Sequence, residues 1–367
     1  VIVGELLESG IIKEVGHGES SGGRRPILLE LNPRAAHIFT ASLQRGQMVA
    51  AVFDLTTNVL AEVHRNMDTS TPEDVVEAIG NAFENLTRDA GVEPGSVLWC
   101  GVVTPGLVDV NGGLVQRSTN LGWLAIPLGP MISHRLGGIP VHVENIANGA
   151  ALAEKVHGQG QGYDHLIYIN LSVGVSAGII AQGEIFRGGR GYAGELGHVA
   201  SLVNDGPLCT CGRRGCLEAI CGVRAVLQKA KDTIPGEVLV EQGITSDELA
   251  ISHLASPAFM ELREVQDLVR DIGSAVGMLI ANLANLLNPQ AIIFGGELLT
   301  FGDALLGFVE KGVRDHTLTE IGGSVKIKTS NLRGRAPLIG AYTLALEHVF
   351  GMEEWPITHE PAVERGQ

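Results

Sequence analysis

A cluster of cysteines within residues 194–218 constrains this chain more than any other stretch. The segment reads GELGHVASLVNDGPLCTCGRRGCLE. It holds three of the chain's five cysteines, Cys209, Cys211 and Cys216, and His198 precedes them by one short loop. Thiolates and imidazole are the ligands that Zn²⁺ prefers, and a structural zinc site closes with four of them in a tetrahedron. The sequence therefore predicts that these four residues hold one zinc ion.

The spacing within the cluster supports this prediction. Cys209 and Cys211 can reach one ion from an extended turn, and Gly212 and Gly215 let the backbone turn back so that Cys216 reaches the same ion. With four protein ligands the zinc would be structural. The alternatives are a disulfide and free buried thiols. A disulfide is disfavoured, because the chain shows no signal peptide and we expect it in the reducing cytoplasm.

Composition limits the classes of function. The chain has 367 residues, 45% of them hydrophobic, which is enough for two domains with large aliphatic cores. Its net charge of −15 argues against a nucleic-acid-binding surface along the whole chain, although a small DNA-binding head remains open. No apolar run approaches the roughly 20 residues that a membrane helix needs. We therefore expect no membrane partner.

The first 31 residues predict a helix followed by a β-hairpin. Residues 1–10 place apolar side chains on one helix face, and IIKEVG and ILLELN are two short strands around a glycine-rich tip with Arg24 and Arg25. This order matches the second half of a winged helix-turn-helix, with residues 13–31 as the wing and the two arginines near DNA phosphates or the minor groove. An ordinary hairpin arm is the alternative. Because the chain begins Val1-Ile2-Val3-Gly4 without methionine, we expect the natural protein to extend further.

The remaining pattern predicts a two-lobed α/β fold. Three strands over residues 36–66, a helix from about 73 to 90 and a buried strand near 97–105 open an actin-like, ribonuclease-H-like lobe. Further on we expect a helix over 246–254, a long helical stretch over 259–287, a buried strand, a helix over 302–315, a strand and a last helix over 336–349. We predict a first lobe from residues 36–145 plus 335–350, and a second lobe with the zinc site from residues 146–334.

The cysteine cluster also resembles a known family. Residues 209–218 fit the pattern C-x-C-G-x-x-G-C-x-E in full, which is the hallmark of the ROK family of sugar-responsive repressors and sugar kinases. The preceding stretch is similar to the family's second pattern, beginning with LSVGVSAGII and continuing with Gly188, Gly194, Gly197 and His198. Ser176 departs from it, because glycine is usual there. The resemblance implies a sugar-kinase fold preceded by a winged helix-turn-helix remnant.

Two catalytic features of the family's kinases are missing. The kinases carry D-x-G-G-T in the first hairpin to hold ATP phosphates and Mg²⁺, whereas this chain has Ser-Leu-Gln-Arg-Gly-Gln over residues 42–47. The kinases read E-N-D-A-N where this chain has ENIAN, so Ile146 takes the place of the aspartate that serves as general base. Isoleucine accepts no proton, and general base catalysis is typically worth about 10²–10⁴-fold. We therefore predict no catalytic residue and no enzyme activity.

The resemblance does imply a sugar site. The positions that match the family's sugar-binding residues are Asn120, Asn145, Glu195, His198 and Glu218. Carboxylates pair well with vicinal sugar hydroxyls, and His198 could bind zinc with one ring nitrogen and face the sugar with the other. Glu195 could instead be a capping or ion-pair residue, and Trp123, in the nearby TNLGW stretch, could belong to the core. Ile146 removes one acceptor from the site, which could leave a ligand hydroxyl unpaired.

These features favour a sugar-responsive transcriptional regulator of carbohydrate metabolism genes, most simply a repressor. The resemblance implies operator DNA and a sugar or sugar derivative as partners, and a dimer or tetramer, because dimers match two DNA half-sites by symmetry. The GRRP tip is similar to the wing of ROK repressors, a segment that the family's kinases lack. Two alternatives remain: a ROK-type hexose kinase using ATP with an unusual base, and a DNA-binding protein controlled by a protein partner.

Overall fold

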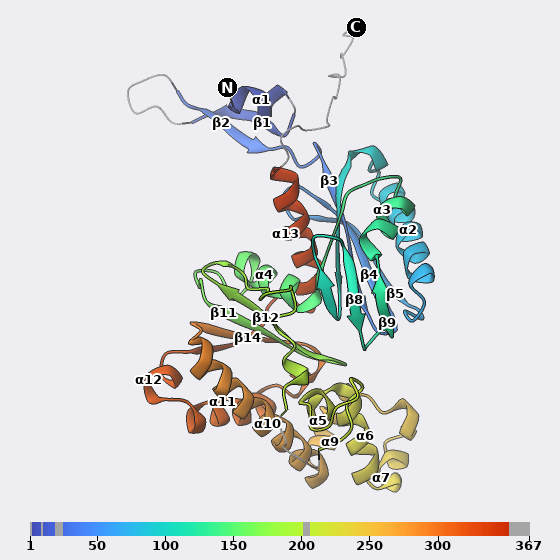
Figure 1. Ribbon diagram of the computed structural model, residues 1–367, viewed down its shortest axis with the longest axis vertical. Helices are drawn as coiled ribbons and strands as arrows, with labels where there is room; N and C mark the ends of the chain where they lie inside the picture. The colour runs from blue at the N-terminus through green and yellow to red at the C-terminus, as the bar shows by residue number, and fades with distance from the viewer. Residues whose placement is uncertain (1, 9, 19–24, 201–205, 352–367) are drawn as a thin grey trace.

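The computed structural model describes residues 2–8, 10–18, 25–200 and 206–351. The molecule is elongated, with a small N-terminal arm, a first sheet and a second sheet following one another along its length (Figure 1). We call the part around the first sheet, with the last helix, the first lobe and the part around the second sheet the second lobe. Within the described residues no helix is long and apolar enough to span a membrane.

The N-terminal arm contains the predicted helix and hairpin. Helix α1 (Ile2–Glu8) precedes the antiparallel strands β1 (Ile12–His17) and β2 (Ile27–Leu31). Ile11 is buried against the first lobe, in a cluster with Ile38, Phe53 and Tyr342, so the arm is anchored there. Arg25 is exposed at the start of the returning strand, and Arg24 lies outside the described residues. The helix and hairpin are confirmed, and the DNA-binding role of the two arginines stays a prediction.

The first lobe is a five-stranded sheet in the order β10-β6-β3-β4-β5. Strands β3 (His37–Gln44), β4 (Gln47–Asp54) and β5 (Val59–Asn66) form an antiparallel meander, whereas β6 (Val97–Thr104) and β10 (Val141–Asn145) add in parallel. Helices α2 (Pro72–Asp89) and α3 (Leu128–Arg135) cover one face, and α13 (Ala336–Phe350) covers the other (Figure 1). As predicted, the last helix packs back on the first lobe.

A small three-stranded sheet extends the first lobe toward the second. It consists of β7 (Leu107–Asp109), β8 (Leu114–Ser118) and β9 (Trp123–Ile126). Trp123 is 3% exposed, belongs to the core of the first lobe, and its Nε1 donates a hydrogen bond to the carbonyl of Ser70 at 3.0 Å. The core-packing interpretation of Trp123 is therefore confirmed, and its neighbour Asn120 is left at the edge facing the second lobe.

The second lobe repeats the strand pattern of the first. Its sheet has the order β13-β12-β11-β14-β15, in which β11 (Leu166–Leu171), β12 (Val175–Ala181) and β13 (Glu184–Ile185) are antiparallel, and β14 (Ala291–Gly295) and β15 (Lys326–Thr329) add in parallel. Three antiparallel strands followed by two parallel ones in each lobe is the ribonuclease-H-like arrangement, so the predicted fold class is confirmed.

Helices cover both faces of the second sheet. Helix α4 (Ile146–His157) lies between the sheets beside α13, and α10 (Arg263–Leu287) and α11 (Asp303–His316) pack on the opposite face. The close approach of α13 to α4 requires glycine, since a Cβ on Gly340 would lie 1.9 Å from the carbonyl oxygen of Gly149. Shorter helices complete the lobe: α5 (Glu218–Cys221), α6 (Val223–Thr233), α7 (Gly236–Glu241), α8 (Ile251–Leu254), α9 (Pro257–Met260) and α12 (Thr319–Gly322).

Two predicted helices are interrupted. The stretch 259–287 is two helices, α9 and α10, because Leu262 takes an extended backbone and packs on the core of the second lobe. The stretch 246–254 is a 3-10 turn (Ser246–Glu248) followed by α8, and Leu249 between them is extended and 4% exposed. In both cases a leucine with extended backbone packs on the core of the second lobe where the helix is interrupted. Helical periodicity alone does not reveal such a break.

An ion pair joins the two lobes beside their junction. Arg187, which follows β13, donates from Nε and Nη2 to Oε2 of Glu144 at 2.8 Å each, and Glu144 at the end of β10 is fully buried. The other oxygen of Glu144 accepts hydrogen bonds from the backbone N–H of Asn145 at 2.8 Å and from Asn148 at 3.0 Å. The pair therefore fixes the start of α4, where the predicted Asn145 and Ile146 lie.

Replacing Arg187 with alanine is expected to destabilise the fold. The substitution leaves the buried carboxylate of Glu144 without its cationic partner, and breaking a buried pair is costly. Because Arg187 itself is partly exposed, we expect a loss of about 2 kcal/mol in the free energy of unfolding. Urea unfolding measures this, with Arg190→Ala in the same loop as the control. Equal stability of the two variants would contradict the role given to the pair.

Candidate functional site: a cleft beside a Cys3His cluster

A cleft lies where the two lobes meet. The space between the lobes, with its open mouth included, is about 640 Å³. The first lobe contributes the β3–β4 hairpin and the loop after β8, and the second contributes the β11–β12 turn and the segment leading to the cysteines. All five residues predicted to bind sugar line this cleft: Asn120, Asn145, Glu195, His198 and Glu218. Ile146 lines it as well.

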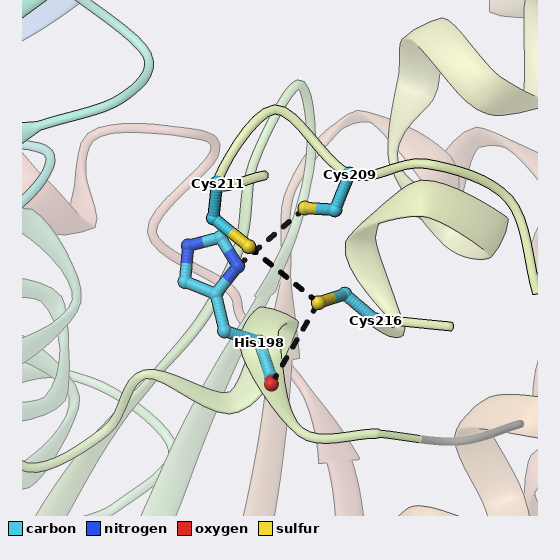
Figure 2. Close-up of side chains that lie close together, drawn as sticks. All are labelled: His198, Cys209, Cys211 and Cys216. Carbon is cyan, nitrogen blue, oxygen red and sulfur yellow. Dashed lines mark hydrogen bonds between the residues drawn. The ribbon is translucent and has the colours of Figure 1, made fainter. Parts of the chain in front are cut away.

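The four predicted metal ligands also come together (Figure 2). The Sγ atoms of Cys211 and Cys216 are 3.7 Å apart, and Sγ of Cys209 is 3.7 Å from Nδ1 of His198. All four ligand atoms lie within 4.8 Å of one another. A tetrahedron with Zn–S bonds of about 2.3 Å has sulfur atoms about 3.8 Å apart, whereas a disulfide needs about 2.05 Å. The distances therefore fit a shared cation, and all the cysteines are free thiols.

The backbone explains how the cluster closes. Gly212 and Gly215 have φ of +88° and +74°, which is the left-handed region where glycine is favoured. The N–H of Cys209 donates to the carbonyl of Arg213 at 2.7 Å, which folds the two arms of the loop together. The two glycines thus make the turn that the spacing predicted.

The thiols of the cluster differ in pKa: burial opposes the shift of Cys211, but hydrogen bonds, first from the backbone N–H of Arg213, lower its pKa. Burial, together with hydrogen bonds from the neighbouring thiols, raises the pKa of Cys216 to about 12. A thiolate at this position therefore needs a positive charge beside it, and a coordinated metal deprotonates a thiol outright.

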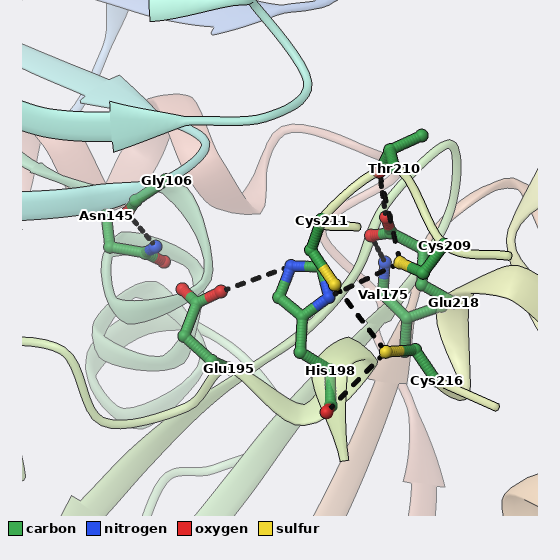
Figure 3. Close-up of polar contacts among 10 residues, drawn as sticks. All are labelled: Gly106, Asn145, Val175, Glu195, His198, Cys209, Thr210, Cys211, Cys216 and Glu218. Carbon is green, nitrogen blue, oxygen red and sulfur yellow. Dashed lines mark hydrogen bonds and ion pairs between the residues drawn. The ribbon is translucent and has the colours of Figure 1, made fainter. Parts of the chain in front are cut away.

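His198 connects the cluster to the cleft. It ends a 3-10 turn (Leu196–His198), with Nδ1 directed at the thiols and Nε2 3.9 Å from a carboxylate oxygen of Glu195 (Figure 3). Glu195 occupies the N-cap position of this turn but makes no side-chain capping hydrogen bond, so the capping interpretation is not supported. Burial, followed by the negative charge of Glu218, raises the pKa of Glu195 to about 7. This carboxyl group can therefore donate as well as accept near neutral pH.

Glu218 is held by the opposite wall of the cleft. It is the first residue of α5, and its Oε2 accepts a hydrogen bond from the backbone N–H of Val175 at 3.1 Å (Figure 3). Its Oε1 lies 3.5 Å from the hydroxyl of Thr210, between two of the cysteines. The cysteine loop therefore orients both Glu218 and His198. Lone pairs of the carboxylate remain for a ligand hydroxyl.

Asn145 and Ile146 form the floor on the side of α4. Asn145 caps the helix, with Oδ1 accepting from the N–H of Ala147 and Nδ2 donating to the carbonyl of Gly106, both at 2.8 Å. One amide N–H and one acceptor lone pair remain for a ligand. Ile146 is 6% exposed and packs with Val103 and Ala341, so it gives the cleft an apolar contact. The strand before it, β10, extends through Asn145, and residues 144 and 145 pair with β6.

The β3–β4 hairpin has no resemblance to a phosphate cradle. Leu43 is fully buried in the core of the first lobe, and Gln44 and Arg45 line the cleft at the turn. A cradle of backbone N–H groups needs closely approaching backbone, and this hairpin carries Gln44 and Arg45 in place of the glycine pair. Sequence reasoning identified the loss of the glycines but not that Arg45 faces the cleft.

Gly174 is a functional position that sequence reasoning did not single out. It lies in the β11–β12 turn, where an added Cβ would come 2.6 Å from Nδ2 of Asn120 and 3.1 Å from Oε2 of Glu218. Its place in the glycine pattern LSVGVSAGII was the available signal. The glycine keeps two of the predicted ligand-binding side chains apart and accessible.

Replacing Gly174 with alanine is expected to weaken ligand binding without unfolding the chain. The methyl group displaces Asn120 or Glu218, and overpacking of this size costs about 1–3 kcal/mol, so we expect roughly tenfold weaker effector binding. Calorimetric titration measures the affinity. Gly189→Ala is the control, because no atom lies within 4 Å of its added Cβ. Unchanged affinity in the Gly174 variant would contradict the placement of a ligand at this turn.

Comparison with known proteins identifies the family of this chain. A sequence model described as the ROK family matches residues 44–348. The xylose repressor of Caldicellulosiruptor bescii is 29% identical over 360 residues, which cover 96% of this chain and 88% of the repressor. These matches include the cleft and the cysteine cluster.

Solved structures agree with the sequence comparison. A ROK family transcriptional regulator, described as a homologue of the E. coli MLC protein, matches with a TM-score of 0.79 and 26% identity over 94% of this chain and 87% of that one. A ROK family glucokinase from Streptomyces griseus, solved with glucose and AMPPNP, matches with a TM-score of 0.76 and 30% identity over 85% of this chain and all of that one. By sequence, fold and Cys3His cluster, this chain belongs to the ROK family.

Proposed function

We propose that this chain is the sensor of a sugar-responsive, DNA-binding transcriptional regulator, most simply a repressor, without kinase activity. One observation carries the proposal: the cleft keeps the hydroxyl-pairing residues Glu195, His198 and Glu218, while Ile146 and the Arg45 hairpin stand where a kinase needs its base and its phosphate cradle. A site of this kind can bind a sugar but has no group at the base position to accept the proton of the attacking hydroxyl.

The N-terminal arm supports the DNA-binding half of the proposal. Its hairpin precedes the stretch matched by the family and would be the wing of a winged helix-turn-helix, with Arg24 and Arg25 near the tip. We propose residues 1–31 as part of this DNA-binding unit, residues 36–145 plus 335–350 as the first lobe, and residues 146–334 as the second. Similarity to a xylose repressor over nearly the whole chain favours the same role.

The Cys3His cluster would hold zinc, with Cys209, Cys211, Cys216 and His198 as ligands. Three thiolates and an imidazole at these distances suit Zn²⁺ better than the hard cations that prefer oxygen ligands. A bound zinc would fix the cysteine loop, and with it the orientation of His198 and Glu218. Such a zinc–thiolate site is suited to the reducing cytoplasm, where we place the protein.

Regulation requires the effector to prefer one arrangement of the lobes. The ligand-binding side chains come from both lobes, so a sugar that contacts Asn120 and Glu218 together would favour closure. In a homodimer or tetramer, closure would shift the DNA-binding arms relative to one another and change the affinity for operator DNA.

Ligand binding and ADP formation, measured on the purified protein, distinguish a sensor from a kinase. We expect calorimetry against a panel of sugars and sugar derivatives to identify at least one ligand, and we expect no ADP formation above background with that ligand, ATP and Mg²⁺. The kinase is the second candidate, favoured by the 30% identity to a glucokinase. Ligand-dependent ADP formation would establish it and contradict the proposal. Specific DNA binding that no sugar alters would instead favour control by a protein partner.

A further inference from the structure

Two arginines from different lobes line adjoining cavities at the cleft, and hydroxyl binding does not explain them. Arg45 lies at the β3–β4 turn of the first lobe and lines the cleft. Arg224, the second residue of α6, lines an adjoining cavity of the second lobe that shares Asn120, Val173 and Glu218 with the cleft. A molecule paired with Asn120 and Glu218 can therefore reach both guanidinium groups.

Neither arginine has an ion-pair partner within the described residues. Arg45 makes a single long hydrogen bond, from Nη1 to the carbonyl of Asn120 at 3.5 Å. Burial and the nearby charge of Arg45 lower the pKa of Arg224, while Glu218 acts in the opposite direction. Asp68 is the acidic neighbour of Arg45, and its pKa is lowered chiefly by hydrogen bonds from Ser70 and only slightly by Arg45. The charge of one guanidinium group disfavours the charge of the other, so a ligand anion placed between them would be favourable.

The surroundings suit a phosphate more than a lone charge. Helix α6 begins at Val223 behind Gly222, which offers no side-chain cap, so the positive end of the helix adds to the field of Arg224. Guanidinium groups hold phosphate oxygens with paired N–H donors, and two of them can hold one phosphate from opposite sides. Next to them, Asn120 and Glu218 can pair with hydroxyl groups.

We propose that the cleft binds a sugar phosphate, with its hydroxyls on Asn120 and Glu218 and its phosphate between Arg45 and Arg224. This rests on the proposed function, and it names the chemical class of the effector. Arg45 stands where the kinases have a cradle glycine, so the chain replaces a site for the phosphates of ATP with one for the phosphate of the effector. The phosphate would also connect the two lobes, since each lobe supplies one of the arginines that bind it.

The test compares sugars with their phosphates by calorimetry on the full chain. The probes are D-glucose, D-xylose and D-fructose, their 6-, 5- and 6-phosphates respectively, inorganic phosphate and ATP. From two charge-assisted contacts we expect one sugar phosphate to bind at least about thirtyfold more tightly than its parent sugar. In Arg45→Ala and in Arg224→Ala we expect this preference to fall about tenfold, and in the double variant to vanish.

Three control variants test whether the phosphate binds between Arg45 and Arg224. Arg88→Ala removes an exposed arginine far from the cleft and should change nothing. Arg117→Ala and Arg213→Ala remove the arginines of a neighbouring cavity beside His198. Loss of the preference in these two variants, with Arg45→Ala and Arg224→Ala unaffected, would overturn the assignment. Unfolding midpoints check that each variant is folded.

The remaining outcomes separate the inference from the proposed function. Equal affinity for a sugar and its phosphate would overturn the inference and leave a neutral-sugar sensor standing. If inorganic phosphate binds as tightly as any sugar phosphate, the site is a general anion site and the inference is overturned. ATP binding that depends on Arg45 and Arg224 would assign the phosphate to a nucleotide instead. If no sugar and no sugar phosphate binds, the proposed sensor function itself fails.

Discussion

The double substitution Cys209→Ser and Cys211→Ser is expected to remove the metal and the effector response together. The variant would lose two of the four proposed ligands, so we expect about one zinc ion per chain in the unmodified protein and none in the variant. A metal present at about 1,000 times its dissociation constant stabilises the folded state by about 4 kcal/mol, and this contribution should disappear. Metal analysis and urea unfolding measure the two effects.

The functional effect follows from the geometry of the cysteine loop. His198 would be one of the four metal ligands, and Glu218 lies within reach of Thr210 between Cys209 and Cys211. Without the metal both side chains lose their fixed orientation, so we expect effector affinity to fall by at least about tenfold. Cys221→Ala is the matched control, because Cys221 is buried in the core of the second lobe, outside the cluster. A double variant that loses its zinc and keeps its effector response would contradict the coupling.

Glu218→Ala is expected to cause the largest loss of effector affinity of any single substitution in the cleft, about 100-fold. The carboxylate accepts from the N–H of Val175 and offers its remaining lone pairs to ligand hydroxyls. A hydrogen bond to a charged group contributes about 1.5–3 kcal/mol, and the backbone N–H of Val175 also loses its acceptor. Calorimetry with the identified effector measures the change.

A conservative variant of Glu218 separates the contribution of its charge to effector affinity from that of its shape. Glu218→Gln keeps an acceptor for Val175, so we expect a smaller loss of affinity, about tenfold. Glu310→Ala, on the exposed side of α11, is the control for loss of a surface carboxylate. Effector affinity that is the same in Glu218→Ala and in the control would place the ligand elsewhere.

Local chemistry made much of this site predictable from sequence. The cysteine spacing and the two glycines specify a loop that can close on one ion, and its geometry depends on few other contacts. The strands and most helices follow from periodicity, because each buries one side on a sheet. The five residues taken from the family resemblance all line one cleft, although their role toward a ligand stays a proposal.

What the sequence did not reveal depends on contacts between distant segments. Arg45 and Arg224 lie 179 positions apart (224 − 45), so only the meeting of the lobes brings them to adjoining cavities. The pair of Arg187 and Glu144 crosses the same junction. The break at Leu262 reflects the packing of one side chain, which no local pattern encodes. Interactions of this kind need the tertiary fold before they can be seen.

Effector-dependent DNA binding tests the central claim most directly. The protein would be titrated, at fixed salt, with the DNA upstream of its own gene, with and without each sugar and sugar phosphate of the panel. We predict specific binding whose affinity one effector changes by at least about tenfold, as expected for a coupling free energy of 1–3 kcal/mol. Absence of specific binding, together with effector-dependent ADP formation, would contradict the regulator and establish a kinase.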